Sequence, residues 1–172
     1  MADVGLSYAR EMAKGSTGTP ATRLLDEEGC DYSIHRYQHN PRSESYGLEA
    51  AQALGVTEDD VYKTLVVETD RGFAVAVLPV SHQLSLKAFA AAAGAKRAKL
   101  AELSDVVRLT GYVAGGVSPI GQRRALPTVV DDSARNKTGI YVSGGRRGLD
   151  IRLKPGDLVE LLQARYARLT AT

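Results

Sequence analysis

Two glycine-rich runs carry residue types that suit the binding of an oxygen-rich ligand. The first is Gly111-Tyr-Val-Ala-Gly-Gly-Val-Ser-Pro-Ile-Gly-Gln122, followed by Arg123 and Arg124, and the second is Ser143-Gly-Gly-Arg-Arg-Gly148. Glycine permits positive φ and has no side chain, so successive N–H groups can turn toward an anion or a carbonyl oxygen. The runs predict one shared oxygen-binding pocket; the alternative is a pair of tight turns in a β-rich protein.

The motifs of common hydrolases do not fit this sequence. Gly116 to Gly121 has the four-residue gap of a P-loop, but Gln122 and Arg123 stand where that motif needs Lys and then Ser or Thr. Neither Ser118 nor Ser143 lies in the Gly-x-Ser-x-Gly pattern of a nucleophile elbow. The sequence therefore argues against a nucleoside triphosphatase and against a serine hydrolase.

The sequence gives little support for a metal site or for disulfide chemistry. His35 and His39 are four residues apart, but the interval runs from a predicted strand into a loop, and no carboxylate or cysteine completes a metal motif. Cys30 is the single cysteine, which excludes an internal disulfide and fits a reducing compartment. We expect neither a metal nor a cofactor. Without an activated side-chain nucleophile, an enzyme of this kind needs water or a group on the substrate to attack.

The composition indicates one soluble domain of the cytoplasm. A chain of 172 residues, 44% hydrophobic and 24% charged, is long enough to bury a core without disulfides. The 22 Lys and Arg against 20 Asp and Glu leave a formal charge of +2, so contacts with RNA must come from local patches. No secretory or membrane-spanning apolar segment is found. Oligomeric state stays open.

The order of elements predicts an α+β fold. Residues 1–18 form a flexible leader in this interpretation, and residues 19–172 form the domain. Helix, strand, helix, hairpin, short helices, several strands and a final helix do not show regular βα alternation. Many short strands with tight turns predict a single compact domain with a curved, mixed but mainly antiparallel sheet, barrel-like and surrounded by helices.

Two side chains at strand ends are candidates for the pocket. Tyr37 closes the strand predicted from Cys30 to Gln38, and Lys63 opens the strand from Tyr62 to Thr69. Tyr37 can line a pocket edge or simply pack beside a loop. Lys63 can hold a phosphate or a ribosyl ester, and the alternative is a solvated charge at a strand end.

The residues Val61-Tyr-Lys-Thr-Leu65, the Gly111–Gln122 run, Leu126-Pro-Thr128 and the stretch Ile140-Tyr-Val-Ser-Gly-Gly-Arg-Arg-Gly-Leu-Asp-Ile151 together resemble the YbaK family. The resemblance is closest to its Cys-tRNA(Pro) deacylases and covers the chain from about Thr19 to the final helix. It implies a compact α+β fold and a trans-editing hydrolase that removes a mischarged amino acid from the 3′ end of tRNA.

The resemblance also assigns residues to the site. Lys63 matches the essential lysine of the family. The substrate-binding positions that it implies are Tyr37, Tyr46, Thr64, Gly115, Gly116, Ser118, Ser143, Gly145 and Asp150. Tyr46 stands where a close relative has phenylalanine, which keeps the pocket wall and adds a hydroxyl. Asp150 either contacts the substrate or orients the second glycine run.

In the cysteine-specific branch of the family, the thiol of the substrate attacks the ester carbonyl, which agrees with the missing protein nucleophile. Two alternatives stay open. In the first, the protein removes alanine or another small amino acid; one methylene gives only about 1 to 3 kcal/mol of discrimination, so the sequence does not separate these substrates. In the second, the protein is a non-catalytic RNA-binding adaptor. The near-neutral charge and the resemblance indicate that a prolyl-tRNA synthetase partner supplies tRNA specificity.

Overall fold

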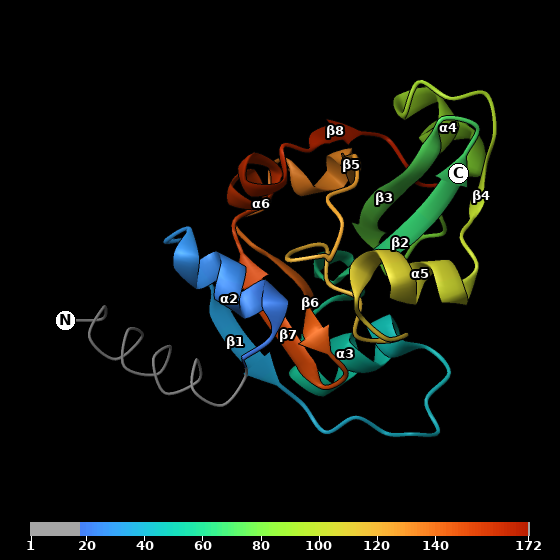
Figure 1. Cartoon of the computed structure of the whole chain (residues 1–172). Helices are drawn as coiled ribbons and strands as arrows, with labels where there is room; N and C mark the ends of the chain where they lie inside the picture. The colour runs from blue at the N-terminus through green and yellow to red at the C-terminus, as the bar shows by residue number, and fades with distance from the viewer. Residues whose placement is uncertain (1–17, 172) are drawn as a thin grey trace.

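The computed structural model describes residues 18–171, so the predicted leader lies, except for Gly18, outside the described residues. Figure 1 shows short helices around two β-sheets. The helices are α2 (Pro20–Glu27), α3 (Tyr46–Leu54), α4 (Leu86–Ala92), α5 (Leu103–Thr110) and α6 (Pro155–Leu162), with 3-10 turns η1 (Glu58–Asp60) and η2 (Asp132–Ala134). None of these described helices has the length and apolar character needed to cross a membrane.

The strands are β1 (Ser33–Arg36), β2 (Tyr62–Thr69), β3 (Gly72–Pro79), β4 (Ala98–Leu100), β5 (Thr128–Asp131), β6 (Ile140–Arg146), β7 (Leu149–Leu153) and β8 (Arg165–Ala167). They form an antiparallel sheet in the order β1-β7-β6 and a mixed sheet in the order β4-β2-β3-β5-β8. In the mixed sheet β2 is antiparallel to β3 and β4, whereas β3–β5 and β5–β8 are parallel.

The α+β class is confirmed, but the sheet differs from the expectation. Within residues 18–171 there are two sheets in place of one, and they close into no barrel. A single parallel bridge joins Val61, the residue before β2, to Tyr141 of β6. The two sheets therefore meet at the beginning of β2, immediately before Lys63.

Alternation along β1, β7 and β6 gives the three-stranded sheet one apolar and one polar face. Its apolar side chains belong to the main core, which includes Leu25 of α2 and Leu158 of α6; from the sheet this core takes Ile34, Ile140, Val142, Ile151 and Leu153. Residues of opposite parity, including His35 and Asp150, which are cross-strand neighbours, lie on the other face. The requirement to bury the apolar face thus presents Asp150 on the face opposite the core.

The beginning of α2 holds both glycine runs. Thr19 is its N-cap and forms a capping box with Thr22, as the Thr-Pro sequence predicts. The Thr19 hydroxyl also donates to the Gly144 carbonyl at 2.6 Å, which ties the helix to the second run. In the first run, a Cβ added to Gly121 would lie 2.5 Å from the Pro20 carbonyl oxygen. Both runs are therefore fixed against one helix terminus.

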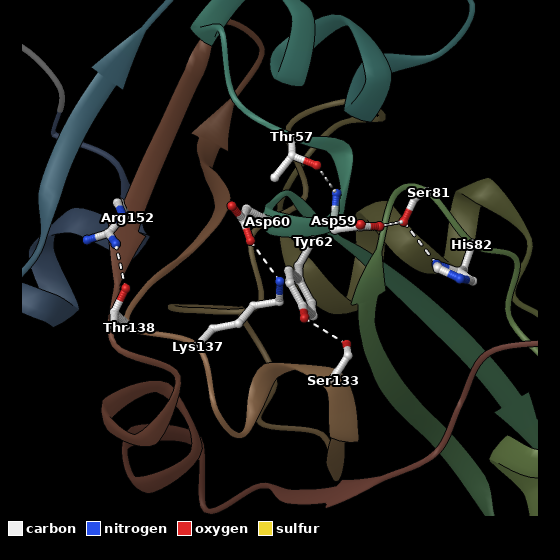
Figure 2. Close-up of polar contacts among 10 residues, drawn as sticks. All are labelled: Thr57, Asp59, Asp60, Tyr62, Ser81, His82, Ser133, Lys137, Thr138 and Arg152. Atoms are coloured by element: carbon white, nitrogen blue, oxygen red, sulfur yellow. Dashed lines mark hydrogen bonds and ion pairs between the residues drawn. The ribbon is translucent and has the colours of Figure 1, made fainter.

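Polar contacts fix the segment that leads into β2 (Figure 2). Lys137 donates to the Asp60 carboxylate at 2.7 Å, and the hydroxyls of Tyr62 and Ser133 lie 2.7 Å apart. Ser81, after β3, donates to the Asp59 carboxylate at 2.7 Å. The start of β2 is thereby attached on both sides, which limits the movement of the next residue, Lys63.

Candidate functional site

A cavity of about 320 Å³ lies where the two sheets meet, beside α3 and the first glycine run. This volume is in the range of small-ligand sites. Seven of the ten predicted site residues line it: Tyr37, Tyr46, Lys63, Thr64, Gly115, Ser143 and Asp150. The structure thus brings Lys63, both glycine-rich segments and the strand-end tyrosine to one place.

Three predicted residues do not line this cavity and instead support its wall. A Cβ on Gly116 would lie 2.7 Å from the Arg146 Cα, because the two glycine runs touch there. Ser118 is fully buried, and its hydroxyl accepts from the Ile120 N–H at 3.2 Å. Gly145 packs against Thr19 and Tyr112 on the side of α2.

Lys63 brings a partly buried ammonium group to the cavity. Burial lowers the pKa of the Lys63 side chain, because removal from water disfavours the charged form. Among residues 18–171 no carboxylate forms an ion pair with it. A partly desolvated cation without a protein counter-ion is suited to bind a phosphate or another anion of a ligand.

The backbone of β2 is open on the cavity side. β4 pairs with β2 only at Val67–Thr69 and β6 forms only the bridge at Val61, so in the described chain no ladder to a partner strand covers Lys63 to Leu65 on that edge. Peptide groups of successive residues in a strand point to opposite edges, so residues two apart share an edge, and the Val66 carbonyl accepts from the Ala101 N–H on the β4 edge. The N–H of Thr64 therefore points to the same open edge. It is a candidate donor to a substrate carbonyl.

The two glycine runs offer fewer free backbone N–H donors than their number of glycines suggests. The Gly116 N–H donates to the Val113 carbonyl at 2.9 Å, and the Gly145 N–H donates to the Ser143 hydroxyl at 3.2 Å. Both are therefore engaged within the protein. Gly115 has φ of 81°, and a Cβ there would lie 2.6 Å from the Tyr46 ring. Only glycine lets this backbone approach the ring so closely.

A stack of side chains at the edge of the cavity was not predicted. The Arg147 guanidinium lies 5.3 Å from the centroid of the Tyr46 ring, and its Nε donates to the Ala114 carbonyl at 2.7 Å. On the same tyrosine, the His39 ring lies at 5.7 Å, and its Nδ1 is 2.7 Å from the Glu49 carboxylate. The paired arginines of the second glycine run were the available signal. The stack offers a flat, positively charged edge for a base or a phosphate.

Asp150 is a buried carboxyl in the cavity wall, with 5% of its surface exposed. Burial raises the pKa of the Asp150 carboxyl to about 7. The neighbouring Tyr37 phenol also has a raised pKa, about 12, first because of burial and then because of Asp150, so it stays neutral. The site thus holds a carboxyl that titrates near neutrality and a phenol that can donate a hydrogen bond.

The raised pKa of Asp150 predicts that Asp150→Asn stabilises the protein at high pH. The folded chain binds this proton more tightly than the unfolded chain, so the free energy of unfolding falls as pH rises from about 4 to about 7. Asn removes that penalty. At pH 8 we expect the melting temperature of Asp150→Asn to exceed that of wild type by about 2 °C or more, the shift that roughly 1 kcal/mol of unfolding free energy produces in a chain of this size. At pH 4 the two melting temperatures should be equal.

Thermal unfolding of both proteins at pH 4 and pH 8 checks this expectation. Glu160→Gln, at an exposed position of α6, controls for the loss of one negative charge. Wild type and variant are compared at the same pH, so that protonation of His35, the cross-strand neighbour of Asp150, contributes to both melting temperatures. A lower melting temperature for Asp150→Asn at pH 8 would contradict the prediction.

Together the cavity offers an unpaired ammonium, an open strand edge, a glycine backbone and a buried carboxyl. Among residues 18–171, no three His, Cys, Asp or Glu side chains gather closely enough to hold a metal ion. These groups can bind an ester with an anionic end and polarise its carbonyl, while attack comes from water or from the ligand itself.

The family model described as an aminoacyl-tRNA editing domain matches residues 43–161. EbsC of Enterococcus faecalis, whose name proposes Cys-tRNA(Pro)/Cys-tRNA(Cys) deacylase activity, is 34% identical over 162 residues, 92% of this chain and 98% of that protein. The multifunctional Ser/Thr-tRNA deacylase ProXp-y of Escherichia coli is 26% identical over 94% of this chain and 98% of its own length. A solved structure described as a proposed trans-editing enzyme for prolyl-tRNA synthetase has a TM-score of 0.78, 24% identity, and coverage of 95% of this chain and 98% of its own.

Proposed function

Because the chain belongs to the aminoacyl-tRNA editing domain family and is therefore an aminoacyl-tRNA deacylase, we propose that its main substrate is tRNA(Pro) mischarged with cysteine. The observation that carries this proposal is the shared cavity of Lys63, Gly115 and Asp150, in which the described lining residues include no activated side-chain nucleophile. A substrate that supplies its own thiol suits such a cavity, and the 34% identical relative is named for this activity.

In the proposed mechanism the protein binds and polarises, and the cargo attacks. The Lys63 ammonium holds a phosphate at the 3′ end of the tRNA, and Tyr46 with Arg147 borders the terminal base. The N–H groups of Thr64 and Gly115 face the ester oxygen as negative charge develops on it, where one such donor is worth roughly 2.7 to 4 kcal/mol.

The proposed reaction needs no cofactor, because each bond that breaks is matched by one that forms. The cysteine sulfur attacks the ester carbonyl, a C–S bond forms, and the C–O bond to the ribose breaks. The thiol proton passes to the ribose oxygen, which leaves as a hydroxyl, and water then opens the thioester. Since the first step is a cyclisation within the substrate, the thiol provides the selectivity that a pocket for small side chains lacks.

A second candidate is release of serine, alanine or another small amino acid by water. It is favoured by the 26% identical relative, which acts on Ser- and Thr-tRNA. The cavity volume of about 320 Å³ accommodates any of these side chains, so size alone gives little selection among them. A non-catalytic adaptor would bind charged tRNA and release no amino acid.

We expect tRNA(Pro) charged with cysteine to be deacylated at least tenfold faster than the same tRNA charged with alanine, serine or proline. The measurement is kcat/KM for each charged tRNA, with and without prolyl-tRNA synthetase. S-methylation of the cysteine should reduce the rate to that of alanine, because the attacking thiol is lost. Equal rates for cysteine and alanine would support the water mechanism, and binding without release would support the adaptor.

We propose that a prolyl-tRNA synthetase partner selects the tRNA. The formal charge of +2 gives little general attraction for RNA, which supports a partner as the source of tRNA specificity. In the panel above, the synthetase should increase the preference for tRNA(Pro) over other tRNAs. Identical preference with and without it would count against the partner.

The remaining expectations on architecture and location are also proposals. We take residues 19–172 as the deacylase domain, because α2 supports both glycine runs. The two sheets, bridged at Val61 and Tyr141, would act as one curved wall around the substrate end. A tRNA substrate supports a cytoplasmic location for the reaction.

A further inference from the structure

The cavity wall contains a buried carboxylate for which residues 18–171 supply no ion-pair partner. Asp150 lies on β7 with 5% of its surface exposed, and it lines the cavity beside Ser143 of β6 and Tyr37 at the end of β1. Glu44, the other acidic residue of the lining, is exposed. Buried carboxylates are normally paired with a cation or saturated with hydrogen bonds.

Within the described chain, none of the neighbouring cationic groups forms an ion pair with Asp150. Arg152, two residues along the same strand face, donates to the Thr138 hydroxyl at 3.3 Å (Figure 2). His35, directly across from Asp150 on β1, lies 2.7 Å from the Ser33 hydroxyl. Lys63 lines the same cavity, but in residues 18–171 no ion pair joins it to Asp150. The carboxyl therefore faces the cavity without a protein counter-ion.

We propose that Asp150 binds the α-ammonium group of the amino acid carried by the tRNA. This inference rests on the proposed function, because every aminoacyl-tRNA ester carries such a group next to the carbonyl that is attacked. An ammonium restores to the buried carboxylate the interactions that burial removed. The cavity then has a cation, Lys63, for the phosphate end and an anion, Asp150, for the amine end, so its two charges complement those of the substrate.

The titration of Asp150 agrees with this arrangement. Burial raises the pKa of the carboxyl to about 7, and a bound ammonium would lower it again. Binding near neutral pH should thus release protons from Asp150. The other ionisable groups around the carboxyl are His35 and Tyr37 from the β1 side and Lys63 from β2. Of these, the Tyr37 phenol stays neutral and burial lowers the pKa of His35.

The test compares substrates with a free and with a blocked amine. For wild type and Asp150→Asn, kcat/KM is measured with Cys-tRNA(Pro) and with N-acetyl-Cys-tRNA(Pro), whose thiol and ester are unchanged. Wild type should prefer the free amine by about 30-fold, as expected for a charge-assisted hydrogen bond. Asp150→Asn should reduce this preference to about threefold or less by losing activity only on the free amine. Glu160→Gln should keep the wild-type preference.

One result would overturn the inference: an unchanged preference in Asp150→Asn. If both substrates then lose activity equally, Asp150 has a structural role or a role in the chemical step. Binding of 3′-cysteinylamino-3′-deoxyadenosine, with a free or acetylated amine, gives the same comparison without turnover. If wild type hydrolyses neither ester, the proposed function fails, whereas loss of the free-amine preference on binding to Asp150→Asn still supports the ammonium site.

Discussion

Lys63→Ala is expected to lose deacylase activity by about 100-fold or more in kcat/KM while it keeps the fold. Removal of one partner from a desolvated charged contact costs roughly 2 to 5 kcal/mol, because the other charge is left without its partner. Lys63 is partly buried at the cavity and has no ion-pair partner among residues 18–171, so its charge is available to the substrate. The measurement is single-turnover release of amino acid from charged tRNA(Pro).

Removal of the Lys63 charge is expected to cause no loss of stability. Burial lowers the pKa of the Lys63 ammonium, so the charge is less favourable in the folded chain than in the unfolded chain. Lys63→Met, which keeps most of the apolar stem, should melt at the wild-type temperature or above it, yet be as inactive as Lys63→Ala. Lys87→Ala, an exposed lysine of α4, serves as the matched control and should remain active. Wild-type rates in Lys63→Ala would reject the assignment of this lysine.

Local patterns were enough to predict much of this fold. The Thr19-Pro20 helix start, the Ser85-capped helix and the hairpin around Arg71 occur as expected, because caps and turns depend on neighbouring residues. The cavity was also anticipated in part, since Lys63 and Gly115 line it together. Short-range rules suffice for such features.

Other features depend on contacts between distant segments. The division into two sheets depends on how β2 meets β6 at Val61 and Tyr141, which no local pattern encodes. β8 has only three residues, Arg165–Ala167, and its pairing with β5 comes from tertiary packing. The burial that changes Asp150 likewise results from the whole cavity wall. Sequence reasoning could name this residue but could not predict its ionisation.

Gly116→Ala is expected to reduce deacylation by about 100-fold and to lower the free energy of unfolding by roughly 1 to 3 kcal/mol. An added Cβ would lie 2.7 Å from the Arg146 Cα and 3.0 Å from the Arg147 N, both backbone atoms of the second glycine run. Because the nearest atoms belong to the backbone, no flexible side chain can move aside. The runs must separate, which displaces Gly115 in the cavity wall and Arg147 at its edge. Denaturant unfolding and single-turnover release measure the two effects.

Two other glycines separate the causes. Gly156, in the first turn of α6, has no atom within 4 Å of an added Cβ and no positive φ, so Gly156→Ala should leave activity and stability near wild type. Gly29 has equally free space but φ of 66°, so Gly29→Ala should lose stability through backbone strain and keep its activity. If Gly116→Ala behaved like either control, contact between the two glycine runs would not be what shapes the cavity. Loss of both activity and stability in Gly116→Ala, and in neither control variant, would show that the two glycine runs act as one unit.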